Sequence, residues 1–108
     1  MKKPVLRKGA TIQVTARRWF DSHNGNTYHS VQVVCCNNGK ETVLIENFKY
    51  GYDSHYLQTA LGLVWATFEP CKGVRARFRL PWWWQLKDFY RLSESVTDVA
   101  RKKDLAFS

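Results

Sequence analysis

Two tight-turn signals divide the first half of the chain, and they constrain its fold more than any other feature. Asn24-Gly25 and Asn37-Asn38-Gly39 supply residues that tolerate the positive φ angles of short hairpin turns. The segments beside them, residues 11–20, 27–36 and 41–48, are rich in alternating apolar and β-branched side chains. Strands joined by such turns pair with their neighbours in antiparallel fashion. This half of the chain therefore predicts a three-stranded antiparallel meander.

A helical pattern follows the third predicted strand. Apolar side chains recur there at spacings of three and four residues, at Tyr56, Leu57, Ala60, Leu61, Val64, Trp65 and Phe68. This spacing places them on one face of a helix. Asp53 or Ser54 can cap the first turn, and Pro70 ends the helix. We expect the helix to cover one face of the sheet.

Arginines alternate with apolar residues in the segment from Gly73 to Leu80. Read as a strand, the segment directs Arg75, Arg77 and Arg79 to one face, and Val74, Ala76, Phe78 and Leu80 to the other. The guanidiniums would then lie about 6.6 to 7 Å apart, close to the phosphate spacing along one nucleic-acid strand. The alternative is an edge strand whose charges prevent aggregation. The pattern leaves both interpretations open.

Three consecutive tryptophans, Trp82, Trp83 and Trp84, come directly after this segment. Three successive indoles cannot all face one core, so at least one should be exposed or reach a partner. A base-stacking platform and a protein-binding hot spot are the functional interpretations. The alternative is that two of the indoles fill a groove between a helix and the sheet. Contact with a membrane interface is the least favoured interpretation.

The remaining residues predict a second helix, from about residue 84 to about residue 103. The whole pattern predicts an α+β fold: an antiparallel sheet of three to four strands, one helix packed on a face and a second C-terminal helix. Residues 1–10 form a basic lead-in and residues 11–68 a βββα core. Residues 69–108 form an extension with the arginine strand, the tryptophan run and the last helix. We expect one domain overall.

The net charge of +8 favours attraction to nucleic acid or to an acidic protein. The segment from Pro70 through Lys87 contains five basic residues and no acidic residue. Arg17 and Arg18 on the first strand are further candidates for this binding surface. No apolar run is long enough for a transmembrane helix, and no secretory signal is expected, so we expect no membrane partner. Three cysteines, an odd number, predict free thiols in a reducing, cytoplasmic setting.

Catalytic and metal-binding patterns are weak. Cys35 and Cys36 must point to opposite faces of a strand, one to the core and one to solvent, and no C-x-x-C or H-x-x-x-H spacing occurs. We therefore expect no metal, no cofactor and no enzymatic activity. His29, Tyr52 and His55 form a possible polar cluster near the helix start. A hydrolase that uses these histidines is the least favoured hypothesis.

Several short motifs in residues 11 to 65 resemble a group of small uncharacterised proteins of tailed bacteriophages and prophages. The motifs are Arg18-Trp19-Phe20, Gly25-Asn26-Thr27-Tyr28-His29-Ser30-Val31, Tyr50-Gly51-Tyr52 and Tyr56-Leu57-Gln58-Thr59-Ala60. The chain departs from the group at Asp53, where a second glycine is usual, and after residue 69. The resemblance implies a phage origin and an infected bacterial host, and it supplies no mechanism.

The sequence thus favours a small phage-encoded binding protein that contacts nucleic acid through a basic and aromatic surface. Its expected residues are Arg17, Arg18, Arg75, Arg77, Arg79, Trp82, Trp83 and Trp84. The alternative is a protein-directed inhibitor of a host enzyme or anti-phage defence complex. It would use the same surface against acidic residues and an apolar pocket. Both functions place the protein in the host cytoplasm.

Overall fold

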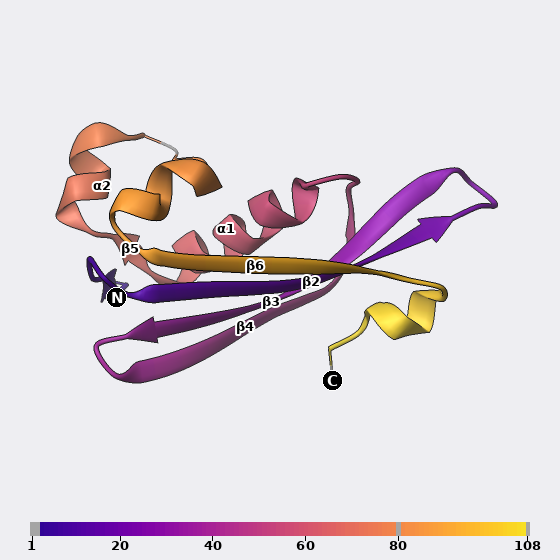
Figure 1. Cartoon of the computed structure of the whole chain (residues 1–108), viewed down its shortest axis with the longest axis horizontal. Coiled ribbons are helices and arrows are strands. Elements are labelled where there is room, and N and C mark those ends of the chain that lie inside the picture. Colours follow the sequence, from indigo (N-terminus) through magenta and orange to yellow (C-terminus); the bar gives the residue numbers. More distant parts are fainter. Residues whose placement is uncertain (1–2, 80, 108) are drawn as a thin grey trace.

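A four-stranded sheet with the order β4-β3-β2-β6 forms the centre of the molecule (Figure 1). The computed structural model describes residues 3–79 and 81–107. Leu80, expected on the apolar face of an arginine strand, lies outside these residues. The strands are β2 (Thr11–Asp21), β3 (Asn26–Asn37), β4 (Lys40–Tyr50) and β6 (Arg91–Val99).

The predicted meander is confirmed. β2 pairs with β3, and β3 with β4, both in antiparallel fashion. Gly25 (φ 71°), Asn38 (φ 54°) and Gly39 (φ 81°) adopt the left-handed backbone that their turns require. One irregularity, between His29 and Val31, shifts the register of β3 against β4.

The fourth strand corrects the predicted topology. Residues 91–99, expected in a C-terminal helix, form β6, which runs parallel to β2 from the pair Thr11–Arg91 to the pair Trp19–Val99. The sheet is therefore mixed, not purely antiparallel. The valine and threonine side chains of β6 suit a strand. Its pairing with β2 also satisfies the backbone N–H and C=O groups along the edge of β2, which a helix in this place would leave unpaired.

Helix α1 (His55–Thr67) packs across one face of the sheet, as predicted. The even-numbered side chains of β2 from Ile12 to Ala16 and their β3 partners from Val31 to Cys35 are buried on that face. Leu57, Ala60, Leu61 and Val64 are the buried positions on the facing side of the helix. The α+β class is thus confirmed, whereas the number and placement of the helices fit the prediction only roughly.

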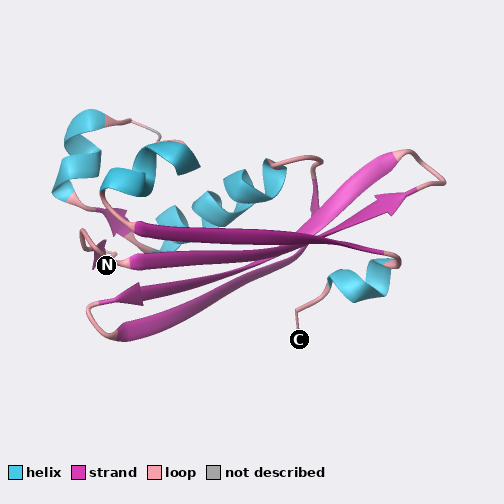
Figure 2. Cartoon of the chain, in the orientation of Figure 1, coloured by secondary structure: helices cyan, strands magenta, loops and turns pink. Residues whose placement is uncertain are grey.

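The arginine segment also differs from its prediction. It forms a short helix, α2 (Lys72–Arg77), and the tryptophan run enters a 3-10 helix, η1 (Trp83–Asp88). Figure 2 shows both helices at one end of the sheet, beside the N-terminal segment. There β1 (Val5–Leu6) and β5 (Glu69–Pro70) form a short parallel pair. The alternating pattern of arginines and apolar residues favours a strand, but the segment is helical and Val74 is fully buried within it.

Figure 1 shows the last element, η2 (Lys102–Leu105), on the sheet face opposite α1. The hydroxyl of Ser30 donates to the Leu105 carbonyl oxygen at 2.5 Å. Earlier in the same extension, β6 joins the sheet, and buried residues of α2 and η1 join the core that β2, β3 and α1 form.

Candidate nucleic-acid interface

The charges of the molecule are segregated along its long axis. Figure 1 shows that α2, η1 and the β3–β4 turn lie at one end of the molecule. Among the described residues, ten exposed basic side chains and three acidic ones belong to this end. The basic residues are Lys3, Arg7, Lys8, Lys40, Lys72, Arg75, Arg77, Arg79, Lys87 and Arg91, and the acidic ones Glu41, Glu69 and Asp88. The other described residues carry six of each sign. We call this part of the molecule the basic end.

Hydrogen bonds between segments distant in the sequence hold the basic end together. The Tyr90 hydroxyl donates to the Leu6 carbonyl oxygen at 2.7 Å and accepts from the Cys71 backbone N–H at 2.9 Å. Burial raises the pKa of Tyr90 well above its usual value. The Gly9 N–H donates to the Phe89 carbonyl at 2.7 Å, and the Glu69 N–H to the Pro4 carbonyl at 2.8 Å. Three segments far apart in the sequence thus form one rigid support.

The three arginines lie on α2 and directly after it. Because Arg75 and Arg77 lie on a helix, the evenly spaced row expected from a strand does not form. Arg75 lies 3.9 Å from Glu69, and the Arg77 guanidinium lies 5.6 Å from the centre of the Phe89 ring. All three side chains, Arg79 included, are exposed. They form a cationic surface patch.

The tryptophan run divides between core and surface. Trp83 is 3% exposed, whereas Trp82 and Trp84 are 57% and 62% exposed. A 3-10 helix has three residues per turn, so Trp83 and Leu86 share the buried side and push the flanking indoles outward. The expectation that the three indoles cannot share one core is confirmed. With part of α1, the indoles line a small hollow of about 50 Å³.

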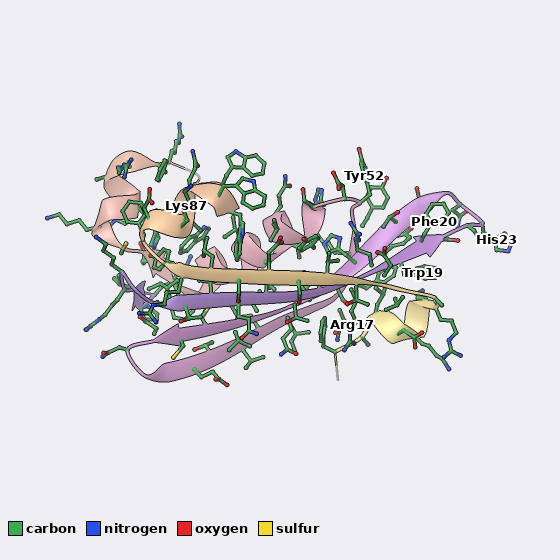
Figure 3. All side chains as sticks on the ribbon, viewed as in Figure 1. Arg17, Trp19, Phe20, His23, Tyr52 and Lys87 are labelled. Atoms are coloured by element: carbon green, nitrogen blue, oxygen red, sulfur yellow. The ribbon has the colours of Figure 1, made fainter. Side chains whose placement is uncertain are left out.

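Arg17 and Arg18 lie at the other end of the sheet and do not join this patch. Arg17 donates to the Ala106 carbonyl at 2.7 Å, and its guanidinium lies 4.1 Å from the centre of the Phe107 ring (Figure 3). Arg18 forms an ion pair with Asp98 at 2.9 Å and donates to the Asp53 carbonyl at 3.0 Å. Both guanidiniums hold parts of the fold together.

The expected polar cluster is only partly formed. His29 is fully buried; its Nδ1–H donates to the Gly51 carbonyl at 3.1 Å, so its Nε2 can accept from the Thr59 hydroxyl at 2.7 Å. Burial is the main reason that its pKa lies below the usual value. His55 lies 5.8 Å from His29 between ring centres and is exposed.

Tyr52, the third expected member, is 69% exposed and points away from the sheet (Figure 3). The loop before it is tightly packed, since a Cβ on Gly51 would lie 2.6 Å from a ring atom of His55. His29 therefore links the loop at Gly51 to Thr59 of helix α1. It has no access to a ligand.

The cysteines follow the expected alternation. Cys35 is buried and Cys36 is exposed. Burial raises the pKa of the Cys35 thiol to about 11, which disfavours the reactive thiolate. Across residues 3–79 and 81–107, no three histidine, cysteine or acidic side chains are grouped as a metal site would need. None of the helices in the same residues is long and apolar enough to cross a membrane.

Sequence reasoning missed part of the basic end. Arg7, Lys8, Asn38 and Gly39 line a shallow hollow of about 430 Å³, into which the β3–β4 turn brings residues far from the N-terminus in sequence. The Arg7 backbone N–H donates to the Asn37 side chain at 3.0 Å. The sequence shows the N-terminal basic segment and the arginine segment as two separate clusters of positive charge. Only the tertiary contacts place them together.

Comparisons with protein-family models, with curated proteins and with solved structures found no match for this chain.

Proposed function

We propose that this protein binds nucleic acid through its basic end. The segregation of charge carries the proposal. Ten exposed basic side chains share one end with three acidic ones, whereas the other described residues include equal numbers of basic and acidic side chains. Phosphate backbones attract such a surface because bound cations replace condensed counterions. Arg75, Arg77 and Arg79 present guanidiniums, which form paired hydrogen bonds with phosphate oxygens. The phage origin implied by the sequence pattern is part of this proposal.

The second candidate is an acidic host protein bound by the same surface. The hollow beside Trp82 and Trp84 favours it, because its floor includes the apolar side chains of Leu57 and Leu61. An inhibitor of a host enzyme would place one apolar group there and acidic groups against the arginines. Nucleic acid is preferred because the cations extend well beyond this hollow, over α2 and the N-terminal segment.

Fluorescence anisotropy with labelled oligonucleotides tests the proposal. The wild-type protein should bind at low salt, and its affinity should fall steeply as salt is added. Arg75→Glu/Arg79→Glu should weaken binding strongly and reduce the slope of affinity against salt. The matched control is Lys49→Glu/Lys103→Glu, which changes the net charge equally but lies outside the basic end. It should weaken binding much less.

Equal effects of the two double variants would show that net charge alone causes the binding, and would contradict the assigned surface. If no DNA or RNA binds at low salt, nucleic-acid binding is wrong. A stoichiometric protein captured from nuclease-treated host lysate, and lost on Arg75→Glu/Arg79→Glu, would then support the second candidate.

A further inference from the structure

Two exposed indoles, Trp82 directly before η1 and Trp84 within it, stand on a backbone that hydrogen bonds hold in place. The Trp82 N–H donates to the Gln85 side-chain oxygen at 2.8 Å, and the Gln85 N–H donates back to the Trp82 carbonyl at 3.0 Å. Below them, Trp83 and Leu86 are anchored in the core. The indole positions are therefore organised before any ligand arrives, which lowers the entropy cost of binding.

The helical period of η1 aligns one indole with a cation. In a 3-10 helix, side chains three residues apart lie on the same side, so Lys87 lies on the same side of η1 as Trp84. Trp84 thus has a cation on its own side of η1. A ligand that contacts both must offer a flat apolar surface and a negative charge close together.

The hollow beside these indoles is small, and its lining mixes apolar and polar residues. Leu57 and Leu61 give it an apolar floor, and Ser54 and Gln58 give it polar groups. Its volume of about 50 Å³ is too small to enclose a nucleobase. A base could lie flat against an indole with one edge near the Gln58 amide. This arrangement suits stacking, which tolerates any base, better than enclosed recognition of one base.

Unpaired bases supply this combination, and a duplex does not. In a duplex the base faces are already stacked on one another, and only the phosphates and groove edges are accessible. A single strand offers a free base face and a phosphate at every nucleotide. We infer that the ligand of the basic end is single-stranded nucleic acid, with bases stacked on Trp82 and Trp84 and phosphates on the neighbouring cations. This inference rests on the proposed function.

Three probes of equal length test the inference by anisotropy at one low salt concentration: a single strand, its duplex, and an abasic single strand that keeps the phosphates. The wild-type protein should bind the single strand at least about tenfold more tightly than the other two. Trp82→Ala/Trp84→Ala should reduce single-strand affinity by about tenfold or more, because stacking on each ring contributes substantially. Its affinity for the abasic strand should not change.

Two further variants show whether the effect comes from stacking. Trp82→Phe/Trp84→Phe keeps an aromatic face at both positions and should retain most of the affinity. Phe20→Ala/Tyr52→Ala removes side chains of similar exposure, 59% and 69%, outside the basic end, and should bind like the wild type. Thermal melting checks that each variant is folded, and none of these side chains is buried.

The possible failures are distinct. If single strand and duplex bind equally, or if the alanine variant loses nothing, the inference is wrong while the proposed function stands. If none of the three probes binds, the proposed function itself fails, and this inference fails with it.

Discussion

The ring of Phe89 occupies the space that a side chain on Gly73 would need. A Cβ built on Gly73 would lie 2.7 Å from the Cε1 atom of Phe89, which is closer than real contacts allow. Gly73 lies in α2 and Phe89 follows η1, so this contact joins the two helices of the basic end. The absence of a side chain on Gly73 thus allows α2 to pack against the Phe89 ring, directly after η1.

Gly73→Ala should therefore destabilise the protein, although alanine is the better helix former. We expect the free energy of unfolding to fall by about 1–3 kcal/mol, as for other overpacked sites. Gly62→Ala is the control: Gly62 lies in α1 with open space around it, so the same change should raise stability by about 0.5–1 kcal/mol. Urea denaturation measures both. Equal effects of the two substitutions would contradict the contact with Phe89.

Stability should decrease in mildly acidic solution because of His29. Its pKa is lowered in the folded protein, chiefly by burial, with smaller contributions from His55 and Lys49. Below the ordinary value of 6.5, the unfolded chain takes up a proton that the folded chain resists. This contribution to the free energy of unfolding is therefore complete above pH 6.5. It is lost as the pH falls through the window between the ordinary and the folded pKa.

Urea denaturation between pH 5 and pH 8 measures this loss. His29→Gln should lower stability at neutral pH and flatten the dependence, whereas His23→Gln, in an exposed turn, should leave the slope as it is. If the free energy of unfolding of His29→Gln depends on pH as steeply as that of the wild type, other groups cause the pH dependence.

Arg17 should act through the C-terminal segment and not through a ligand. Arg17→Ala removes the donors to the Ala106 and Asp104 carbonyls and the contact with the Phe107 ring. We expect a loss of about 1 kcal/mol in stability and faster hydrogen exchange at the Phe107 amide, which donates to Asn47. Affinity for nucleic acid should change by less than about twofold. A large loss of affinity with unchanged hydrogen exchange would restore Arg17 to the binding surface.

The sequence predicted those elements whose signals are local. Gly25, Asn38 and Gly39 adopt positive φ, which glycine and asparagine tolerate whatever surrounds them, so the meander could be predicted directly from the sequence. The apolar period of α1 is equally local, and so is the rule that three consecutive indoles cannot share one core. The exposure of Trp82 and Trp84 is the part of the candidate site that follows from that rule. Sequence could not tell which of the three would be buried.

The predictions of secondary structure were wrong in two segments where the spacing of side chains favoured one element and the tertiary contacts another. In β6, Leu92, Val96 and Val99 match a helical spacing, yet the segment is a strand because β2 offers an open edge. In α2, the alternation of arginines matches a strand, yet a helix forms because it buries Val74 and lets Gly73 approach Phe89. Backbone hydrogen bonds and core packing outweigh local propensity in such short segments.

The sequence by itself determined the meander, the first helix, the positive charge and the presence of exposed indoles. These depend on backbone limits at turns, on apolar spacing and on composition. Only the tertiary structure decided that Arg17 and Arg18 hold the fold together, that Arg7, Lys8 and Arg91 join α2 at one end, and that Trp83 is the buried indole. Those outcomes depend on which surfaces meet, and that is set by the parallel pairing of β6 with β2 and by the contacts of Tyr90.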